Sequence, residues 1–172
     1  MIPLRITVQG FMCYRDRQTV DFAGASLWVL AGENGSGKST LFDAMTVALY
    51  GEHRAGKQHL GDLINHHADA FDVEFDFECE GQAFRVKRTQ PRRGSSTRAA
   101  FTIARDGREQ PIGGTTSRDG FNRWRDELIG LNLKAFTSCV VLLQGKADAL
   151  INAEPADRML ILSNLIDLSS YQ

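Results

Sequence analysis

Several features that define other classes of protein are missing from this sequence. It has no apolar run that approaches the length of about 18 residues required by a membrane-spanning helix. Its first residues, Met1–Arg5, lack the charged segment, long apolar stretch and cleavage site of a secretory signal. The three cysteines, Cys13, Cys79 and Cys139, stand far apart and show no metal-binding spacing. We therefore expect a cytoplasmic protein with reduced thiols, and neither a membrane protein nor a disulfide scaffold.

The composition is that of a soluble globular chain. Hydrophobic residues make up 42% and charged residues 24% of the 172 residues, which suffice for a single domain over residues 1–172. The net charge of −1 says little about partners, but the charge is unevenly distributed. Residues 85–108 contain eight Lys or Arg residues and one acid, Asp106. We refer to residues 85–108 as the basic strip, and it is a candidate contact for nucleic-acid phosphates.

A complete phosphate-binding loop, Gly-x-x-x-x-Gly-Lys-Ser, occupies residues 32–39. Its glycines allow successive backbone N–H groups to turn toward a polyphosphate, where a Cβ atom would clash. Lys38 would contact the β- and γ-phosphate oxygens, and the Ser39 hydroxyl would bind Mg²⁺. The apolar run at residues 26–31 predicts a buried strand before the loop, and the spacing over residues 40–50 predicts a helix after it. The phosphates would lie at that helix's N-terminus, so we expect a nucleoside triphosphate to bind here.

The rest of the pattern predicts an α/β fold. Apolar–polar alternation and glycine-containing turns predict an antiparallel β meander at about residues 72–112, inserted after the first strand–loop–helix unit. Gly51 and Gly130 are expected to end two helices. Further strands are predicted over residues 4–8, 19–22 and 138–143. Helices are predicted over residues 121–129 and from Pro155 onward.

The sequence lacks two motifs that would complete a hydrolytic site of a known type. No short apolar run ends in Asp-Glu, the carboxylates that would hold Mg²⁺ and activate water. Asn-Lys-x-Asp, which a GTPase needs to bind guanine, is also missing. Gln144, after the strand predicted over residues 138–143, would share the sheet edge at which the phosphate-binding loop opens. Its amide would ligate Mg²⁺ or hold the attacking water, although spacing alone favours a surface amide.

These motifs together resemble the SbcC family of DNA double-strand-break repair ATPases. The similar segments are Gly32–Thr40 followed by Leu41–Gly51, then Val141–Gly145 and Pro155–Arg158, and their order and spacing agree across essentially the whole chain. The family's members are ABC-type ATPases related to SMC proteins. The resemblance implies a P-loop NTPase of the α/β class, the N-terminal lobe of an ABC-type ATPase head with the β meander as an insertion. It also implies that a coiled-coil helix, which in the family leads to a zinc hook, starts at about residues 155–172.

The resemblance assigns roles to individual residues. The residues that would hold the phosphates are Asn34, Gly35, Ser36, Gly37, Lys38, Ser39 and Thr40. Ser39 and Gln144 would ligate Mg²⁺, and Lys38 and Gln144 would act in catalysis. The segment Phe11–Tyr14 would approach the base, although Met12 stands where family members often have arginine.

The implied function is that of the ATP-binding half of the ATPase subunit in a DNA end-processing nuclease complex, in which ATP binding drives dimerisation of the heads on DNA. The signature motif of a second copy would cap the ATP, and the C-terminal lobe of the same protein would supply the catalytic carboxylates. Residues 168–172 imitate the signature motif but lack both of its glycines, so this chain by itself would be nearly inactive as an ATPase. Double-stranded DNA and an SbcD-type metallophosphoesterase nuclease would be further partners, in the cytoplasm at the nucleoid. The alternative is a non-nuclease SMC- or RecF-like DNA-binding ATPase.

The basic strip divides into two groups of side chains. Arg92, Arg93 and Arg98 lie in a Gly/Ser-rich segment without acidic neighbours, and we expect them to contact DNA phosphates without regard to base sequence. Arg85 and Lys87 are expected instead to pair with acids across the hairpin. The candidate acids are Glu74, Asp76 and Glu78.

Overall fold

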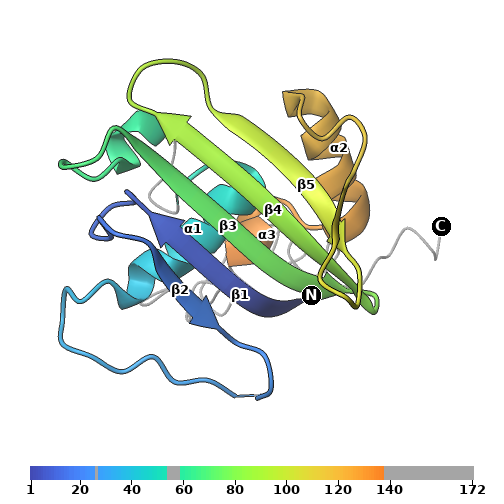
Figure 1. Ribbon diagram of the computed structural model, residues 1–172, viewed down its shortest axis with the longest axis horizontal. Helices are drawn as coiled ribbons and strands as arrows, with labels where there is room; N and C mark the ends of the chain where they lie inside the picture. The colour runs from blue at the N-terminus through green and yellow to red at the C-terminus, as the bar shows by residue number, and fades with distance from the viewer. Residues whose placement is uncertain (26, 54–58, 138–172) are drawn as a thin grey trace, which may run out of the picture. The chain divides into compact units, whose positions relative to one another are not determined.

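The computed structural model describes residues 1–25, 27–53 and 59–137 (Figure 1). The chain divides into two units after Arg125. The first unit contains an antiparallel β-sheet and the helix that follows the phosphate-binding loop. Of the second unit, residues 126–137 are described.

The sheet has six strands in the order β2-β1-β3-β4-β5-β6, and every neighbouring pair is antiparallel. The strands are β1 (Ile2–Gln9), β2 (Gln18–Asp21), β3 (Ala70–Cys79), β4 (Gln82–Pro91), β5 (Thr97–Ile103) and β6 (Glu109–Pro111). The strands predicted over residues 4–8 and 19–22 and the meander at 72–112 are confirmed. The meander does not form a sheet of its own, because β3 pairs with β1 along most of its length.

The helices are α1 (Lys38–Tyr50), the 3-10 helix η1 (Leu60–Leu63), α2 (Arg118–Ile129) and α3 (Leu133–Ala135). The helices predicted over residues 40–50 and 121–129 are thereby confirmed. Helix α1 ends at Gly51, whose φ of 67° is in the left-handed region and whose amide donates to the Val47 carbonyl at 2.8 Å. None of the helices in the described ranges is long and apolar enough to span a membrane.

One face of the sheet packs against α1, which crosses behind β1, β3 and β4 in Figure 1. Side chains alternate between the two faces of a strand, so every second residue of the central strands enters this core. The fully buried side chains include Ile6, Val8, Val47, Leu49, Phe71, Val73, Phe75 and Val86. Because α1 is buried along most of its length, the helix is fixed relative to the sheet.

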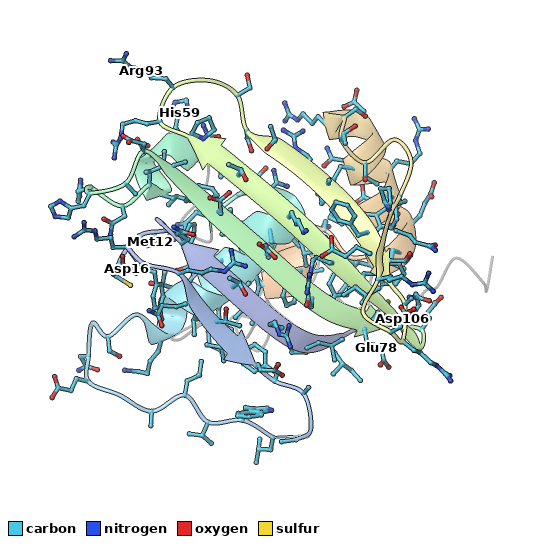
Figure 2. All side chains as sticks on the ribbon, in the orientation of Figure 1. Met12, Asp16, His59, Glu78, Arg93 and Asp106 are labelled. Carbon is cyan, nitrogen blue, oxygen red and sulfur yellow. The ribbon has the colours of Figure 1, made fainter. Side chains whose placement is uncertain are left out.

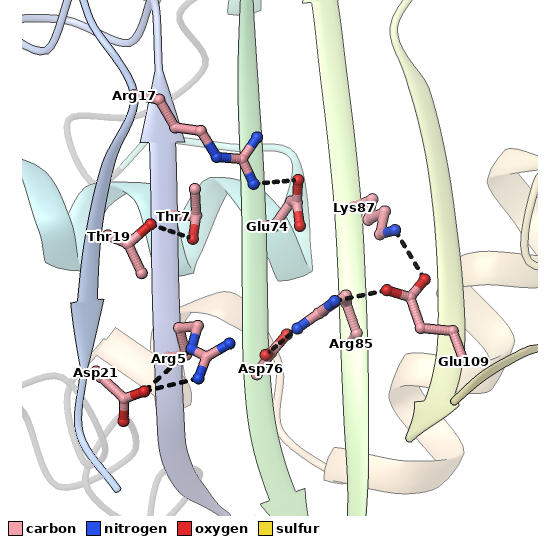
Figure 3. A network of polar contacts seen from close by, with 10 residues as sticks. All are labelled: Arg5, Thr7, Arg17, Thr19, Asp21, Glu74, Asp76, Arg85, Lys87 and Glu109. Carbon is pink, nitrogen blue, oxygen red and sulfur yellow. Dashed lines mark hydrogen bonds and ion pairs between the residues drawn. The ribbon is translucent and has the colours of Figure 1, made fainter. Parts of the chain in front are cut away.

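The opposite face of the sheet is polar and carries ion pairs between strands (Figure 3). Arg85 pairs with Asp76, as predicted, and also with Glu109 of β6. Lys87 pairs with Glu109 at 2.7 Å instead of with an acid of β3. Its ammonium group lies 4.9 Å from the centroid of the Phe101 ring, so the side chain extends over β5 toward β6. Arg85 and Lys87, the two cations of the basic strip that were expected to be structural, therefore both have acidic partners on the sheet.

The strand predicted over residues 26–31 is wrong for its described part, residues 27–31, which are irregular. Leu27 and Val29 are 81% and 80% exposed. A buried strand needs hydrogen-bonded neighbours, and none of the six described strands pairs with this segment. Trp28 is held next to the end of β2, since its indole N–H donates to the carbonyl of Phe22, the residue after that strand, at 2.9 Å. The strand predicted over residues 138–143 and the helix predicted from Pro155 lie outside the described residues.

Candidate functional site

The phosphate-binding loop folds around the ammonium group of Lys38. Lys38 Nζ donates to the carbonyl oxygens of Gly32 and Glu33, both at 2.6 Å, and lies 3.4 Å from Ser36 Oγ. Lys38 is the first residue of α1, so its side chain reaches back across the loop that precedes the helix. A polyanion held in the loop would therefore meet a positive charge at the loop's centre.

Most amide groups of the loop are available to a ligand. Within the described part of the chain, Ser36 is the only residue from Gly32 to Gly37 whose amide donates to a backbone carbonyl, that of Glu33 at 3.2 Å. Gly37, with a φ of 92°, caps the N-terminus of α1, which has neither a capping side chain nor an acid in its first turn. The helix dipole and its free amides thus face the loop without a competing carboxylate. These residues fit a polyphosphate.

The remaining predicted ligands differ in exposure. Asn34 is exposed, and Ser39 is half-buried in the first turn of α1, next to Lys38. Thr40 is buried: its amide donates to the Gly37 carbonyl at 3.0 Å, and its hydroxyl accepts from Cys13 Sγ at 3.7 Å. Its role in holding phosphates stays a prediction. Gln144, the predicted second ligand of Mg²⁺, lies outside the described residues.

The turn between β1 and β2 packs against the phosphate-binding loop. The Tyr14 hydroxyl donates to the carbonyl of Gly37 at 3.1 Å. A Cβ atom on Gly37 would lie 2.7 Å from Cys13 Sγ and 2.9 Å from Tyr14 Oη, so a side chain at this position would have to displace the side chains of Cys13 and Tyr14. Phe11 is fully buried, and its ring packs edge-on against Phe71 with the centroids 5.2 Å apart. The segment predicted to approach the base therefore meets the loop through Cys13 and Tyr14.

Two arginines bind the C-terminal end of α1, a contact that was not predicted from the sequence. Arg88 of β4 is 5% exposed and donates to the Ala48 carbonyl, and Arg125 of α2 donates to the Leu49 carbonyl at 3.4 Å. Burial, reinforced by the positive charges of Arg98 and Arg125, lowers the pKa of Arg88 to about 9. Cations at this end complement the negative end of the helix dipole. Helix α1 is thus held to the sheet at the end opposite the phosphate-binding loop.

The three arginines predicted to contact DNA have different surroundings. Arg92 is fixed, because its guanidinium donates to two carbonyls of the loop at residues 65–68, at 3.0 and 2.8 Å. Arg98 lies in β5, is partly buried and donates to the Ser96 carbonyl at 3.2 Å. Arg93 projects from the β4–β5 loop (Figure 2) and makes no hydrogen bond or ion pair with any other described residue. Arg93 is therefore the member of the three that presents a free guanidinium.

Comparison with known proteins gives a consistent result for the whole chain. The sequence matches a family model described as an AAA domain over residues 5–172. It is 37% identical over 174 residues to the SbcC subunit of the nuclease SbcCD of Deinococcus radiodurans, covering 100% of this chain and 19% of that protein. It is 30% identical over 172 residues to the DNA double-strand break repair Rad50 ATPase of Thermoplasma volcanium, covering 100% of this chain and 18% of that protein. The chain spans about a fifth of the length of these relatives.

A solved structure is similar as well. The recombination mediator protein RecF with ATP, of the RecFOR pathway, aligns with a TM-score of 0.50 at 17% identity, covering 63% of this chain and 27% of that one. At this identity the likeness concerns the fold alone. Together with the AAA domain match, it confirms the predicted α/β fold of a P-loop ATPase lobe.

Proposed function

Because this chain belongs to the AAA domain family, and within it to the SbcC family of DNA repair ATPases, we propose that it is the ATP-binding N-terminal lobe of the ATPase subunit in a DNA double-strand-break repair complex. The observation that carries the proposal is the geometry of the phosphate-binding loop. Its free amides and the start of α1 surround the Lys38 ammonium group. The phosphates of ATP would lie against residues 34–40, with Lys38 on the β- and γ-phosphate oxygens.

Mg²⁺ would accompany the nucleotide. The Ser39 hydroxyl and the Gln144 amide oxygen are the ligands that we propose, because Mg²⁺ prefers oxygen donors. When bound, the ion would neutralise charge on the β- and γ-phosphates. The residues of this chain would thus hold and orient Mg-ATP, while the carboxylates that activate water would come from a C-terminal lobe.

Binding of Mg-ATP to this chain, followed by isothermal titration calorimetry, tests the proposal. We expect saturable binding that is lost in Lys38→Ala. Arg105→Ala is the matched control, since it removes an exposed cation from the hairpin at the opposite end of the sheet from the phosphate-binding loop. Equal binding by the wild type and Lys38→Ala, or no binding by the wild type, would contradict a nucleotide site in this loop.

The site is proposed to be half of a shared one, so hydrolysis by this chain should be very slow. A C-terminal lobe of the same protein is a proposed partner, and exposed apolar side chains support it. Leu27, Val29 and Phe42 are 81%, 80% and 39% exposed, and their burial by a second lobe would be favourable. Rapid, Lys38-dependent hydrolysis of ATP by the chain on its own would contradict the half-site.

Further partners follow from the same proposal. A second copy of the head would dimerise with this one when ATP binds, and an SbcD-type nuclease and double-stranded DNA would join the assembly. The names of the relatives support a role beside a nuclease. The alternative that we keep is a non-nuclease SMC- or RecF-like DNA-binding ATPase. Co-purification of the full-length protein with a metallophosphoesterase would favour the subunit of a nuclease complex. If no metallophosphoesterase co-purifies with the nucleotide-bound protein, the DNA-binding ATPase without a nuclease is favoured.

A further inference from the structure

The turn between β1 and β2 is a closed structure. Phe11 and Tyr14 exchange backbone hydrogen bonds, each amide donating to the other's carbonyl at 2.8 Å. Met12, between them, has a φ of 49°, which reverses the chain direction within four residues. This conformation directs Cys13 and Tyr14 toward the phosphate-binding loop.

A neighbouring loop holds the turn in place. Asn65 Nδ2 donates to the Met12 carbonyl at 2.7 Å, and the Asn65 amide donates to the Gly10 carbonyl at 2.8 Å. The Met12 amide in turn donates to the Leu63 carbonyl at 2.8 Å. With three hydrogen bonds across the two segments, the turn has little freedom to move relative to the loop at residues 63–65.

The Tyr14 hydroxyl therefore acts on the phosphate-binding loop from a fixed position. It donates to the Gly37 carbonyl at 3.1 Å. That carbonyl belongs to the same planar peptide unit as the amide of Lys38, and the C=O and N–H bonds of a trans peptide point in opposite directions. Fixing the carbonyl of Gly37 therefore fixes the direction of the Lys38 N–H, one of the free donors at the N-terminus of α1.

We propose that Tyr14 is a positioning residue for the phosphate-binding loop, orienting the Gly37–Lys38 peptide so that its N–H faces the bound phosphates. This inference rests on the proposed function, because it concerns the same nucleotide site. Burial raises the pKa of Tyr14 above its ordinary value, with a contribution from Cys13. The phenol consequently remains a hydrogen-bond donor at neutral pH.

Tyr14→Phe tests the proposal, because it removes the hydroxyl and keeps the ring. The affinities for Mg-ATP and for inorganic triphosphate are measured by calorimetry, with a melting curve for each variant. We expect both affinities to fall by about threefold to tenfold, the effect of one lost hydrogen bond. Tyr50→Phe, at the other end of α1, is the matched control and should leave both affinities unchanged.

The two ligands separate a positioning role from contact with the base. A loss for Mg-ATP with none for inorganic triphosphate would overturn the proposal in favour of contact between Tyr14 and the base. Unchanged affinity for both ligands in Tyr14→Phe, while Lys38→Ala abolishes binding, would overturn it and leave the nucleotide site intact. If the wild type binds neither ligand, the proposed function and this inference both fail. A fall in melting temperature with unchanged affinities would give Tyr14 a purely structural role.

Discussion

Arg88 donates two hydrogen bonds to the carbonyl oxygen of Ala48, from Nε at 3.2 Å and from Nη2 at 3.1 Å. The pair joins β4 to the last turns of α1 within the core. Replacing Arg88 with Met would remove both bonds from a buried carbonyl, and we expect the free energy of unfolding to fall by about 1–3 kcal/mol. Urea denaturation measures the change, with Arg105→Met as an exposed control. Unchanged or higher stability would mean that desolvation of the guanidinium outweighs its hydrogen bonds.

The two central glycines of the phosphate-binding loop should differ in their tolerance of alanine. Gly35 and Gly37 have φ values of 84° and 92°, so alanine strains the backbone at either position by about 1–2 kcal/mol. Space around Gly35 is open, whereas a Cβ on Gly37 would overlap Cys13 and Tyr14. In thermal unfolding without ligand, we expect a clearly larger loss of stability for Gly37→Ala than for Gly35→Ala. Equal losses would show that the side chains of Cys13 and Tyr14 move aside at little cost.

The Glu109 carboxylate makes part of the stability dependent on pH. Hydrogen bonds from Lys87 and Arg85 lower the pKa of Glu109, against the opposing effect of partial burial. The unfolded chain then binds this proton at a higher pH than the folded one does, so the free energy of unfolding decreases as pH falls through the range between the two values. Between pH 7 and pH 4, the melting temperature should fall less for Glu109→Gln than for the wild type. Glu80→Gln, in an exposed turn, should match the wild-type fall; identical falls in all three proteins would contradict the expectation.

Substitutions of Arg92 and Arg93 should distinguish a structural role from a contact with DNA. Arg93→Glu should weaken binding of a double-stranded oligonucleotide and reduce the salt slope by about 1, while leaving the melting temperature unchanged. Arg92→Glu removes two hydrogen bonds to the loop at residues 65–68, so the melting temperature should fall. Arg105→Glu makes the same change of net charge on the hairpin at the opposite end of the sheet. If Arg105→Glu weakens binding as much as Arg93→Glu does, the effect is one of net charge only.

Much of the sheet could be predicted from the sequence, because most of its strands pair with a neighbour that is close in the chain. Alternation of apolar and polar residues identified β3 and β4, and Gly81 marked the turn between them. The same reasoning failed at residues 27–31, where an apolar run suggested a buried strand. A local pattern records how apolar a segment is, but it cannot say whether a partner is present to accept the strand's hydrogen bonds.

The candidate site was predictable where one motif contains it and unpredictable where distant segments meet. Residues 32–39 identified the phosphate-binding loop without a structure. The contact between Tyr14 and Gly37 could not be foreseen, because it depends on how the β1–β2 turn folds back over α1. A signal did exist for Arg88, which follows Phe84 and Val86 on the inward side of β4. The basic strip is defined by charge alone, so membership of the strip gave no sign that the Arg88 side chain faces the core.

The chain's two tryptophans differ in their surroundings, so intrinsic tryptophan fluorescence can report on the environment of Trp28. Trp124 packs between Phe84 and Phe121, with ring centroids 6.0 and 5.5 Å away. Trp28 is 48% exposed, in the irregular segment four residues before the phosphate-binding loop begins. Water around an indole shifts its fluorescence to longer wavelengths, so we expect Trp28 to emit further to the red than the half-buried Trp124. A lobe or strand that covers this segment would shift the emission of Trp28 to shorter wavelengths, so its binding could be followed without a label on either partner.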